Sequence, residues 1–122
     1  MIGTIGMAGD RRNGDMLLMG VIAAGVFDVD VFWEDEDRRG RRPGEIVTRL
    51  QRGALMAGAT EAHALVVPKE HEAVEAALRM ARPEDLLILT AMDVFERWAQ
   101  IRAFDPDAVP LSEGKVHRLR TG

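Results

Sequence analysis

The chain has 122 residues, 47% of them hydrophobic and 30% charged, which is the size and composition of one globular domain. Its net charge of −4 and high apolar content argue against a disordered chain, and the even spread of basic and acidic residues gives no nucleic-acid-binding tail. Cysteine is absent, which excludes disulfides and thiolate metal sites and favours the cytosol, and the most apolar stretch, residues 16–27, is too short to cross a membrane.

The first elements alternate between strand and helix. Residues 2–7 are a short run of small apolar residues, which is typical of a buried strand. Residues 13–27 follow at helical length, with Asn13 or Asp15 as the cap. Apolar residues lie on nearly every face of this helix, so we expect other structure to cover most of it. Residues 29–33, rich in branched and aromatic side chains, predict the second strand.

The middle of the chain repeats this order. After the polar loop of residues 34–44, Pro43 in the first turn and Gly58 at the end delimit a second helix. Residues 63–67 predict the third strand. The apolar stripe of the third helix comprises Ala73, Val74, Ala77, Leu78 and Ala81.

Residues 86–90 predict the fourth strand, and the last helix follows it. Asp93 and Glu96 form the pattern of a capping box. The residues expected on the buried face of this helix are Val94, Phe95, Trp98 and Ile101. Residues 104–122 lack helical periodicity, and we interpret them as a tail in which residues 115–119 could add one edge strand.

Four strand and helix units with short connections predict an α/β fold: a three-layer, Rossmann-like domain over residues 1–103, with a mostly parallel sheet covered by helices on both faces. In such sheets ligands bind beyond the carboxyl ends of the strands, so the strand-to-helix loops are the candidate sites.

The first of these loops contains Gly9, Asp10, Arg11 and Arg12 and leads into a helix N-terminus. Backbone N–H groups and guanidinium groups together could bind a carboxylate or a phosphate. Equally, Asp10 could cap the helix while both arginines are solvated. Spacing does not decide between these two interpretations.

The other loops carry weaker signals. Residues 34–44 hold four acids followed by four arginines, and such a loop is more often solvated and self-paired than a binding site. Residues 68–71 have no spacing suited to a metal or a nucleophile. Asp93 lies at the same edge of the sheet, where capping alone would account for it.

Several catalytic motifs are absent. The sequence has no P-loop, no G-x-G-x-x-G after the first strand and no serine elbow. Histidines 63, 71 and 117 are too dispersed to indicate a metal site. We therefore assign no catalytic residue and no metal ligand, and expect the chain to contribute to chemistry whose machinery lies elsewhere.

Paired loop motifs point to a family. The matching segments are G-D-R-R at residues 9–12, Phe27-Asp28, E-D-x-D-x-R-G-R-x-x-G-E at residues 34–45, P-E-D-L at 83–86 and V-F-E-R-W at 94–98. Over residues 2–103 this combination resembles the C-terminal domain of cyanophycin synthetases, a branch of the Mur ligase superfamily. Asn13-Gly14 stand where that family tends to carry acids.

The resemblance implies the third domain of a ligase whose central P-loop ATPase domain holds ATP and Mg²⁺. The implied reaction is amide formation, in which a carboxylate is phosphorylated and an amino acid, arginine in the family, attacks the acyl phosphate. The C-terminal domain closes over the ATPase domain and helps to position nucleotide and amino acid. On its own the chain is expected to be inactive.

The resemblance also implies which residues bind. Arg11 and Arg12 would contact an anion, and Asp10, Asp35 or Asp93 would accept a guanidinium or ammonium group. The full candidate set is Gly9, Asp10, Arg11, Arg12, Asp35, Arg38, Arg42 and Asp93. The alternative is a free-standing ligand-binding or oligomerisation module that retains the fold without the reaction. Expected partners are the ATPase domain and the amino acid, with neither nucleic acid nor membrane, and a homo-oligomer remains open.

Overall fold

The computed structural model of the chain describes residues 1–107. Its centre is one sheet of β1 (Ile2–Met7), β2 (Val29–Glu34), β3 (Ala64–Val66) and β4 (Leu87–Leu89). The strand order is β3-β2-β1-β4, and every neighbouring pair is parallel. The predicted parallel sheet is therefore confirmed.

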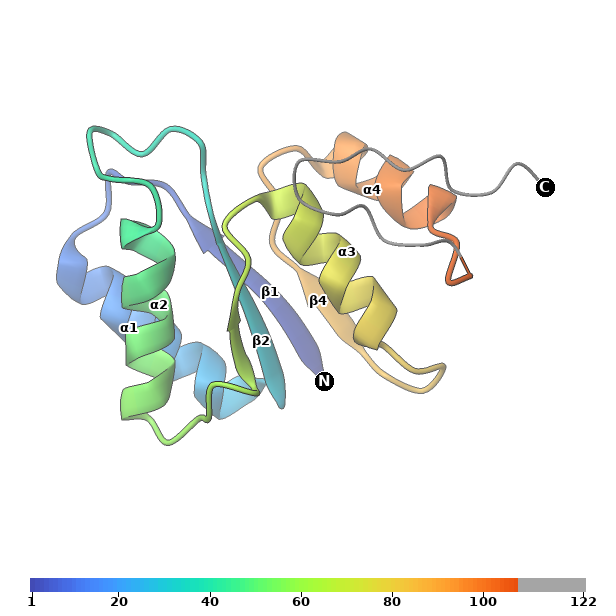
Figure 1. Cartoon of the computed structure of the whole chain (residues 1–122), viewed down its shortest axis with the longest axis horizontal. Helices are drawn as coiled ribbons and strands as arrows, with labels where there is room; N and C mark the ends of the chain where they lie inside the picture. The colour runs from blue at the N-terminus through green and yellow to red at the C-terminus, as the bar shows by residue number, and fades with distance from the viewer. Residues whose placement is uncertain (108–122) are drawn as a thin grey trace.

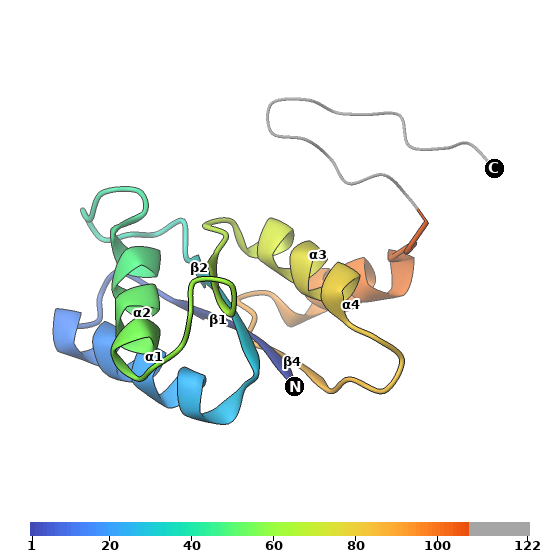
Figure 2. The ribbon, with the colours of Figure 1, turned by 60° about the horizontal axis from the view of Figure 1, so that its bottom comes forward.

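Helices form the two outer layers of this Rossmann-like fold. Figures 1 and 2 show α1 (Asn13–Val26) and α2 (Glu45–Met56) on one side of the sheet and α3 (Glu70–Met80) on the other, with α4 (Val94–Ala103) beside α3. Consecutive strands are joined by helices, as a parallel sheet requires. The three-layer architecture expected from the sequence is confirmed.

Alternation along the strands divides the core in two. Ile5 and Phe32 pack with α1 and α2 on one face of the sheet. Ile2, Val31 and Trp33 pack with the alanines of α3 on the other face. Because successive side chains of a strand point to opposite faces, β1 and β2 each supply both cores, which explains why apolar residues stand at both odd and even positions of these strands.

Glycines allow α1 and α2 to approach closely. A Cβ atom on Gly20 would lie 2.0 Å from the carbonyl oxygen of Leu50, and one on Gly53 would lie 2.0 Å from that of Leu17. No side chain fits at either position, so the helices pack backbone against backbone. This contact is the most extensive helix pairing in the described part of the chain.

Two helix starts differ from the sequence predictions. The N-cap of α1 is Arg12, neither Asn13 nor Asp15, although the Asp15 carboxylate accepts the Arg12 backbone N–H at 3.3 Å. Helix α2 begins at Glu45, so Pro43 precedes the helix and does not lie in its first turn. Gly44, at φ 87°, supplies the left-handed N-cap conformation that glycine adopts without strain.

The predicted burial of two helices is wrong. On α1, Leu18 is 56% and Ile22 51% exposed, because α2 covers only the opposite side. On α4, Val94, Phe95 and Trp98 are exposed, and Arg97 is the residue that points inward. Helix α4 packs against α3 and not against the sheet, which explains why the apolar residues of α4 remain exposed.

Other sequence predictions concern the ends of the chain. Asp93 is the N-cap of α4, as expected, and accepts the Glu96 backbone N–H at 3.0 Å. The edge strand suggested for residues 115–119 lies outside the described residues. Within residues 1–107, no helix has both the length and the apolar character needed to cross a membrane.

Candidate functional site

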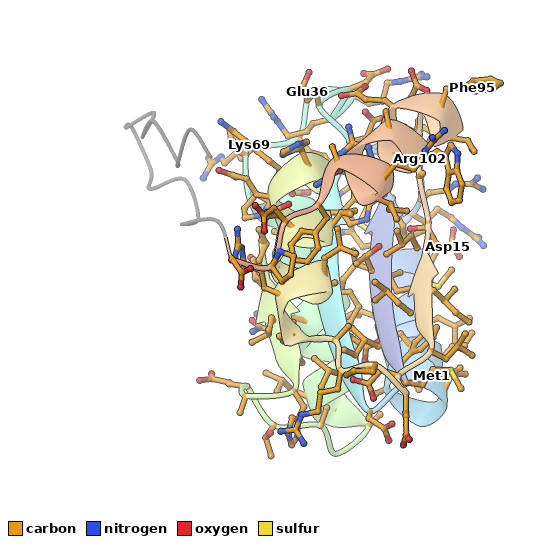
Figure 3. All side chains as sticks on the ribbon, turned by 90° about the vertical axis from the view of Figure 1, so that its right-hand side faces the viewer. Met1, Asp15, Glu36, Lys69, Phe95 and Arg102 are labelled. Carbon is orange, nitrogen blue, oxygen red and sulfur yellow. The ribbon has the colours of Figure 1, made fainter. Side chains whose placement is uncertain are left out.

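The strand-to-helix loops gather at one end of the sheet. Figure 3 shows Glu36, from the loop after β2, and Phe95, at the start of α4, at the end of the molecule opposite Met1. Because all strands are parallel, their carboxyl ends share this edge. The candidate residues of the three loops therefore lie along one edge.

The loops after β1 and β2 are in direct contact. The Gly9 N–H donates to the Asp37 carbonyl at 3.3 Å, and the Asp35 N–H donates to the Met7 carbonyl at 3.0 Å. A Cβ on Gly9 would lie 1.9 Å from the Arg38 carbonyl oxygen. Gly9 is thus required for the close approach of the two loops, which gives this candidate residue a structural role.

Arg41 links the two loops through its side chain. Its Nε donates to the Gly9 carbonyl at 3.0 Å, and its Nη2 donates to the Arg11 carbonyl at 2.8 Å. Its Nη1 donates to Asn13 Oδ1 at 2.6 Å and also to Glu45, whose pKa Arg41 lowers. One guanidinium therefore holds the first loop on the second. The side chain is only 18% exposed.

Sequence reasoning missed Arg41. It stands in a run of four arginines, and the residues selected from that run were Arg38 and Arg42. The G-R-x-x-G-E part of the motif contained the signal, because Glu45 lies four residues after Arg41, the spacing of an ion pair on one helical turn.

The arginines of the first loop already have acidic neighbours. The Arg12 guanidinium donates from Nε and Nη2 to the two carboxylate oxygens of Asp15, at 3.2 and 3.3 Å, and lowers the pKa of Asp15. Arg11 Nε lies 3.9 Å from Asp10. An anion arriving at this loop would have to compete with Asp15 for Arg12, whose side chain is largely exposed.

The arginines of the second loop differ in their pairing. Arg39 pairs with Asp37 at 2.8 Å. Among the described residues, Arg38 Nε is buried and has no hydrogen-bond partner. Arg42 lines an open hollow of about 640 Å³ together with Arg49 and Arg52. Neither Arg38 nor Arg42 has an ion pair with a described acidic residue, so both are better placed than Arg12 to receive an anion.

Glu34 is a second structural residue that the sequence did not separate from its acidic neighbours. Its carboxylate is buried and accepts the backbone N–H groups of Gly44, at 2.8 Å, and Val47, at 3.2 Å. It therefore satisfies the N-terminus of α2 from the end of β2. This contact ties the end of the second loop, where α2 begins, to the end of β2, where the loop starts.

A polar cluster positions the loop after β4. Glu70 accepts the Met92 N–H at 3.2 Å and lies 3.8 Å from the buried Arg97 guanidinium, which also pairs with Glu96 at 2.6 Å. Burial raises the pKa of Glu70, and the nearby Asp35 contributes in the same direction. Asp35 and Glu70 thus share this part of the edge. Asp93 caps α4, as the simpler sequence interpretation had it.

An exposed apolar surface borders the candidate site. We define the α4 apolar surface as Met92, Val94, Phe95 and Trp98, all of them exposed. Phe95 is 88% exposed at the loop end of the molecule (Figure 3). Among residues 1–107 no group of three or more histidines and acids is arranged to hold a metal ion.

Comparison with known proteins gives relatives along most of the chain, although no family model matches it. Over 104 residues, 85% of the chain, it is 33% identical to a cyanophycin synthetase of Synechocystis, and over 88 residues, 72% of the chain, 32% identical to that of Geminocystis herdmanii. A 54-residue stretch is 46% identical to the cyanophycin synthetase of Crocosphaera subtropica. The chain spans 12% and 10% of the length of the first two relatives, so the similarity is to a domain-sized segment.

Proposed function

Because the chain belongs to the cyanophycin synthetase family through one domain-sized segment, we propose that it is the C-terminal, substrate-closing domain of an ATP-dependent amide ligase of the Mur ligase type. In this role it joins no substrates by itself. It closes over a central P-loop ATPase domain, which holds ATP and Mg²⁺, and helps to bring an amino acid to an acyl phosphate.

The observation that carries the proposal is the Arg41 link between the two motif loops. It holds both loops at the carboxyl edge, beside the buried Nε of Arg38 and the exposed guanidinium of Arg42. Loops that are fixed before the substrate arrives present their cations to a phosphoryl or carboxylate group with little reorganisation of the backbone during the reaction. An arrangement of this kind is suited to positioning substrates and not to catalysing the formation of the amide bond.

The proposed roles follow from the pairing of each candidate. Arg38 and Arg42 bind the anion, with Arg11 beside them, whereas Arg12 contributes only after it leaves Asp15. Asp10 and Asp35 are the carboxylates available for the ammonium or guanidinium group of the amino acid. Asp93 acts indirectly, by capping the helix that carries the α4 apolar surface.

The α4 apolar surface supports closure onto a protein. Exposed aromatic residues beside a polar site are typical of surfaces that another protein or domain covers. Phe95 and Trp98 project from the first two turns of α4, next to the loop edge. In the proposed ligase the ATPase domain covers this surface when it meets the loops.

The test uses the complete ligase in which this segment is the proposed domain. Replacing Arg38 and Arg42 together by alanine should reduce amino-acid-dependent phosphate release about tenfold to a hundredfold, since each lost charge-assisted contact contributes roughly 1.5–3 kcal/mol. Arg82→Ala, at the opposite end of the sheet, is the matched control and should leave the rate unchanged. Equal rates for the two variants would contradict the proposed role of the loops.

The alternative is a free-standing assembly module that kept the fold without the reaction. One observation favours it: the outer face of α1 is apolar and exposed. An association through that face is compatible with the ligase proposal as well, because the face does not include the candidate loops.

A further inference from the structure

Helix α2 carries a basic surface that the proposed ligase function does not use. An open hollow of about 640 Å³ lies over the first turns of this helix. We define the α2 basic hollow by the residues that line it, which are Arg42, the Pro43-Gly44 turn, Glu45, Thr48, Arg49 and Arg52. Of its three arginines only Arg42 belongs to a motif loop, so the hollow extends beyond the candidate site.

Helical spacing brings the charged residues of the hollow onto one face. Glu45, Arg49 and Arg52 follow one another at intervals of four and three residues, which places them on the same side of α2. Arg49 and Arg52 are therefore separated by about 4.5 Å along the helix axis. Arg42 lines the same hollow from the preceding loop. Figure 1 shows α2 beginning beside the loop after β2 and running away from it, so the arginines extend from the loop along the helix.

Most hydrogen-bond donors of these arginines are unused. Among residues 1–107, the side chains of Arg42 and Arg52 form neither an ion pair nor a hydrogen bond, and both residues are exposed. The Nε of Arg49 is buried without a hydrogen-bond partner and lies 3.7 Å from Glu45 Oε2. Each guanidinium has five N–H donors. The hollow therefore presents many free donors, all of them on cations.

Neighbouring acids do not balance this positive charge. Residues 41–60 contain four arginines and a single acid, Glu45, although the whole chain has a net charge of −4. Glu45 accepts a hydrogen bond from Arg41, and this contact lowers the pKa of Glu45. Helix α1 packs beside α2, and its one acid, Asp15, pairs with Arg12. An anion that enters the hollow therefore meets little competition from described carboxylates.

The lining of the hollow narrows the class of ligand. It contains no aromatic side chain and no large aliphatic one, so it offers no surface on which a base could stack or a hydrocarbon could be buried. Guanidinium groups match the oxygens of phosphate and carboxylate. Three guanidiniums spread over more than one helical turn exceed what one such group can contact. The geometry therefore suits a polar ligand with several anionic groups.

We propose that the α2 basic hollow binds a small multivalent anion whose charges are phosphate or carboxylate groups. Arg49 and Arg52 bind one group, and Arg42 binds another near the second loop. Thr48 contributes no donor, because its Oγ1 donates to the Gly44 carbonyl at 2.6 Å. The anion competes with the anionic substrate of the proposed ligase for Arg42, but its binding to the chain does not depend on ligation.

Isothermal titration calorimetry of the 122-residue chain with tripolyphosphate and with citrate tests the proposal, at about 20 mM salt because higher salt screens exposed charges. At least one of the two should bind with saturation at one equivalent. Tighter binding of tripolyphosphate assigns a phosphate ligand, and tighter binding of citrate a carboxylate ligand. Inorganic phosphate and acetate have one group each and should bind at least tenfold more weakly.

Matched variants test the named arginines. Replacing Arg49 and Arg52 together by alanine should weaken binding of the multivalent anion at least tenfold. Replacing Arg82 and Arg102 together by alanine removes the same charge outside the hollow and should leave the affinity within about twofold of wild type.

Thr48→Glu separates binding from folding. This variant keeps every arginine and adds a carboxylate to the exposed side of α2 that lines the hollow. Glutamate favours a helix more than threonine does, so thermal unfolding should not be weakened. Binding of the multivalent anion should nevertheless fall at least tenfold, because the new carboxylate repels it and pairs with the arginines.

Backbone amide shifts separate the hollow from the ligase site. In the ¹⁵N-labelled chain the anion should shift the amides of residues 45–52. Shifts confined to residues 9–12 and 35–38 would place the anion at the motif loops alone, which overturns the present proposal and leaves the proposed ligase function intact. Shifts in residues 45–52 combined with normal ligation after loss of Arg38 and Arg42 would contradict only the ligase function.

Four calorimetric results would also overturn the proposal. The first is no saturable binding of tripolyphosphate or citrate up to about 5 mM. The second is equal affinity for inorganic phosphate or acetate, and the third is equal affinity of the Arg49 and Arg52 variant and its control. The fourth is ATP binding at least tenfold tighter than tripolyphosphate, because this would require contacts to the base that the hollow does not offer.

Discussion

Arg41 determines the geometry of the candidate edge more than any residue that contacts a ligand in the proposal. Arg41→Ala removes donors to two backbone carbonyls, to Asn13 and to Glu45. We expect a loss of about 2 kcal/mol in the free energy of unfolding, measured by urea denaturation. Arg41→Lys should restore little of it, because a single ammonium cannot reach all four acceptors that the planar guanidinium contacts.

Arg42→Ala is the control for this change. It removes an arginine from the next position, and Arg42 is exposed, so we expect the free energy of unfolding to stay within about 0.5 kcal/mol of wild type. A similar loss of unfolding free energy in both variants would mean that stability depends on the net charge of the loop and not on the Arg41 contacts.

Asp30 makes stability depend on pH. Its side chain is buried in β2, its Oδ1 has no hydrogen-bond partner among the described residues, and burial raises its pKa to about 7. In the unfolded chain the pKa is about 3.9, so between about pH 4 and pH 7 the folded state holds a proton that the unfolded state has lost. Folding therefore becomes less favourable as pH rises through this window, by at most about 1.4 kcal/mol per pH unit.

Asp30→Asn keeps the shape and removes the titration. In urea denaturation at pH 5, 6, 7 and 8, the variant should gain stability relative to wild type as pH rises, with the difference levelling off above pH 7. A constant difference across this range would contradict the buried-carboxyl explanation. Comparing variant with wild type at each pH cancels the contributions of the other acids.

At this scale the sequence predicted the loops but not the roles within them. The motifs identified residues 9–12 and 34–45 as candidate loops, because the spacing of residues in a motif can be read from the sequence without the fold. Arg39, Arg41 and Arg42 have the same chemistry and neighbouring positions, and only the fold decides which of them faces the backbone carbonyls of another loop. Glu34 and Asp35 differ in the same way, as one lies at the buried end of β2 and the other follows it.

At the scale of elements, glycine has opposite effects on the two sides of α1. Gly20→Ala places a methyl group 2.0 Å from the Leu50 carbonyl and should destabilise the fold by about 2 kcal/mol or more through forced separation of α1 and α2. Gly25→Ala meets open space and should stabilise the helix by up to about 1 kcal/mol. Thermal unfolding at low concentration compares the two. Equal effects would contradict the asymmetric packing of α1.

The helices themselves were predictable, whereas their partners were not. Its helical length predicted α1, and its cap and apolar spacing predicted α4, because these signals lie in the local sequence. Which side becomes covered depends on neighbours from elsewhere in the fold. The described sheet ends at β4, so it does not extend under the outer side of α1. Arg97 holds α4 on Glu70 through polar contacts. The apolar residues on the outer sides of α1 and α4 therefore remain at the surface, although their sequence pattern resembles that of core-facing helices.

At the scale of the whole molecule, the residues with proposed roles in the ligase gather at one edge. The carboxyl edge of the sheet carries the linked loops and the α4 apolar surface, which fit a role in closing over another domain. In the proposed ligase the chain is one part of a larger enzyme, and its contribution to the reaction is positioning.

The purified chain should therefore hydrolyse no ATP. With ATP and Mg²⁺, phosphate release should equal the buffer rate, because the sequence has no P-loop to hold the phosphates and its arginines can neutralise charge but cannot activate water. A coupled phosphate assay measures this, with the double replacement of Arg38 and Arg42 by alanine run in parallel to expose a contaminating ATPase. Turnover that survives the double replacement would come from a contaminant. Turnover that the replacement abolishes would place catalytic machinery in this chain and contradict the proposed division of labour.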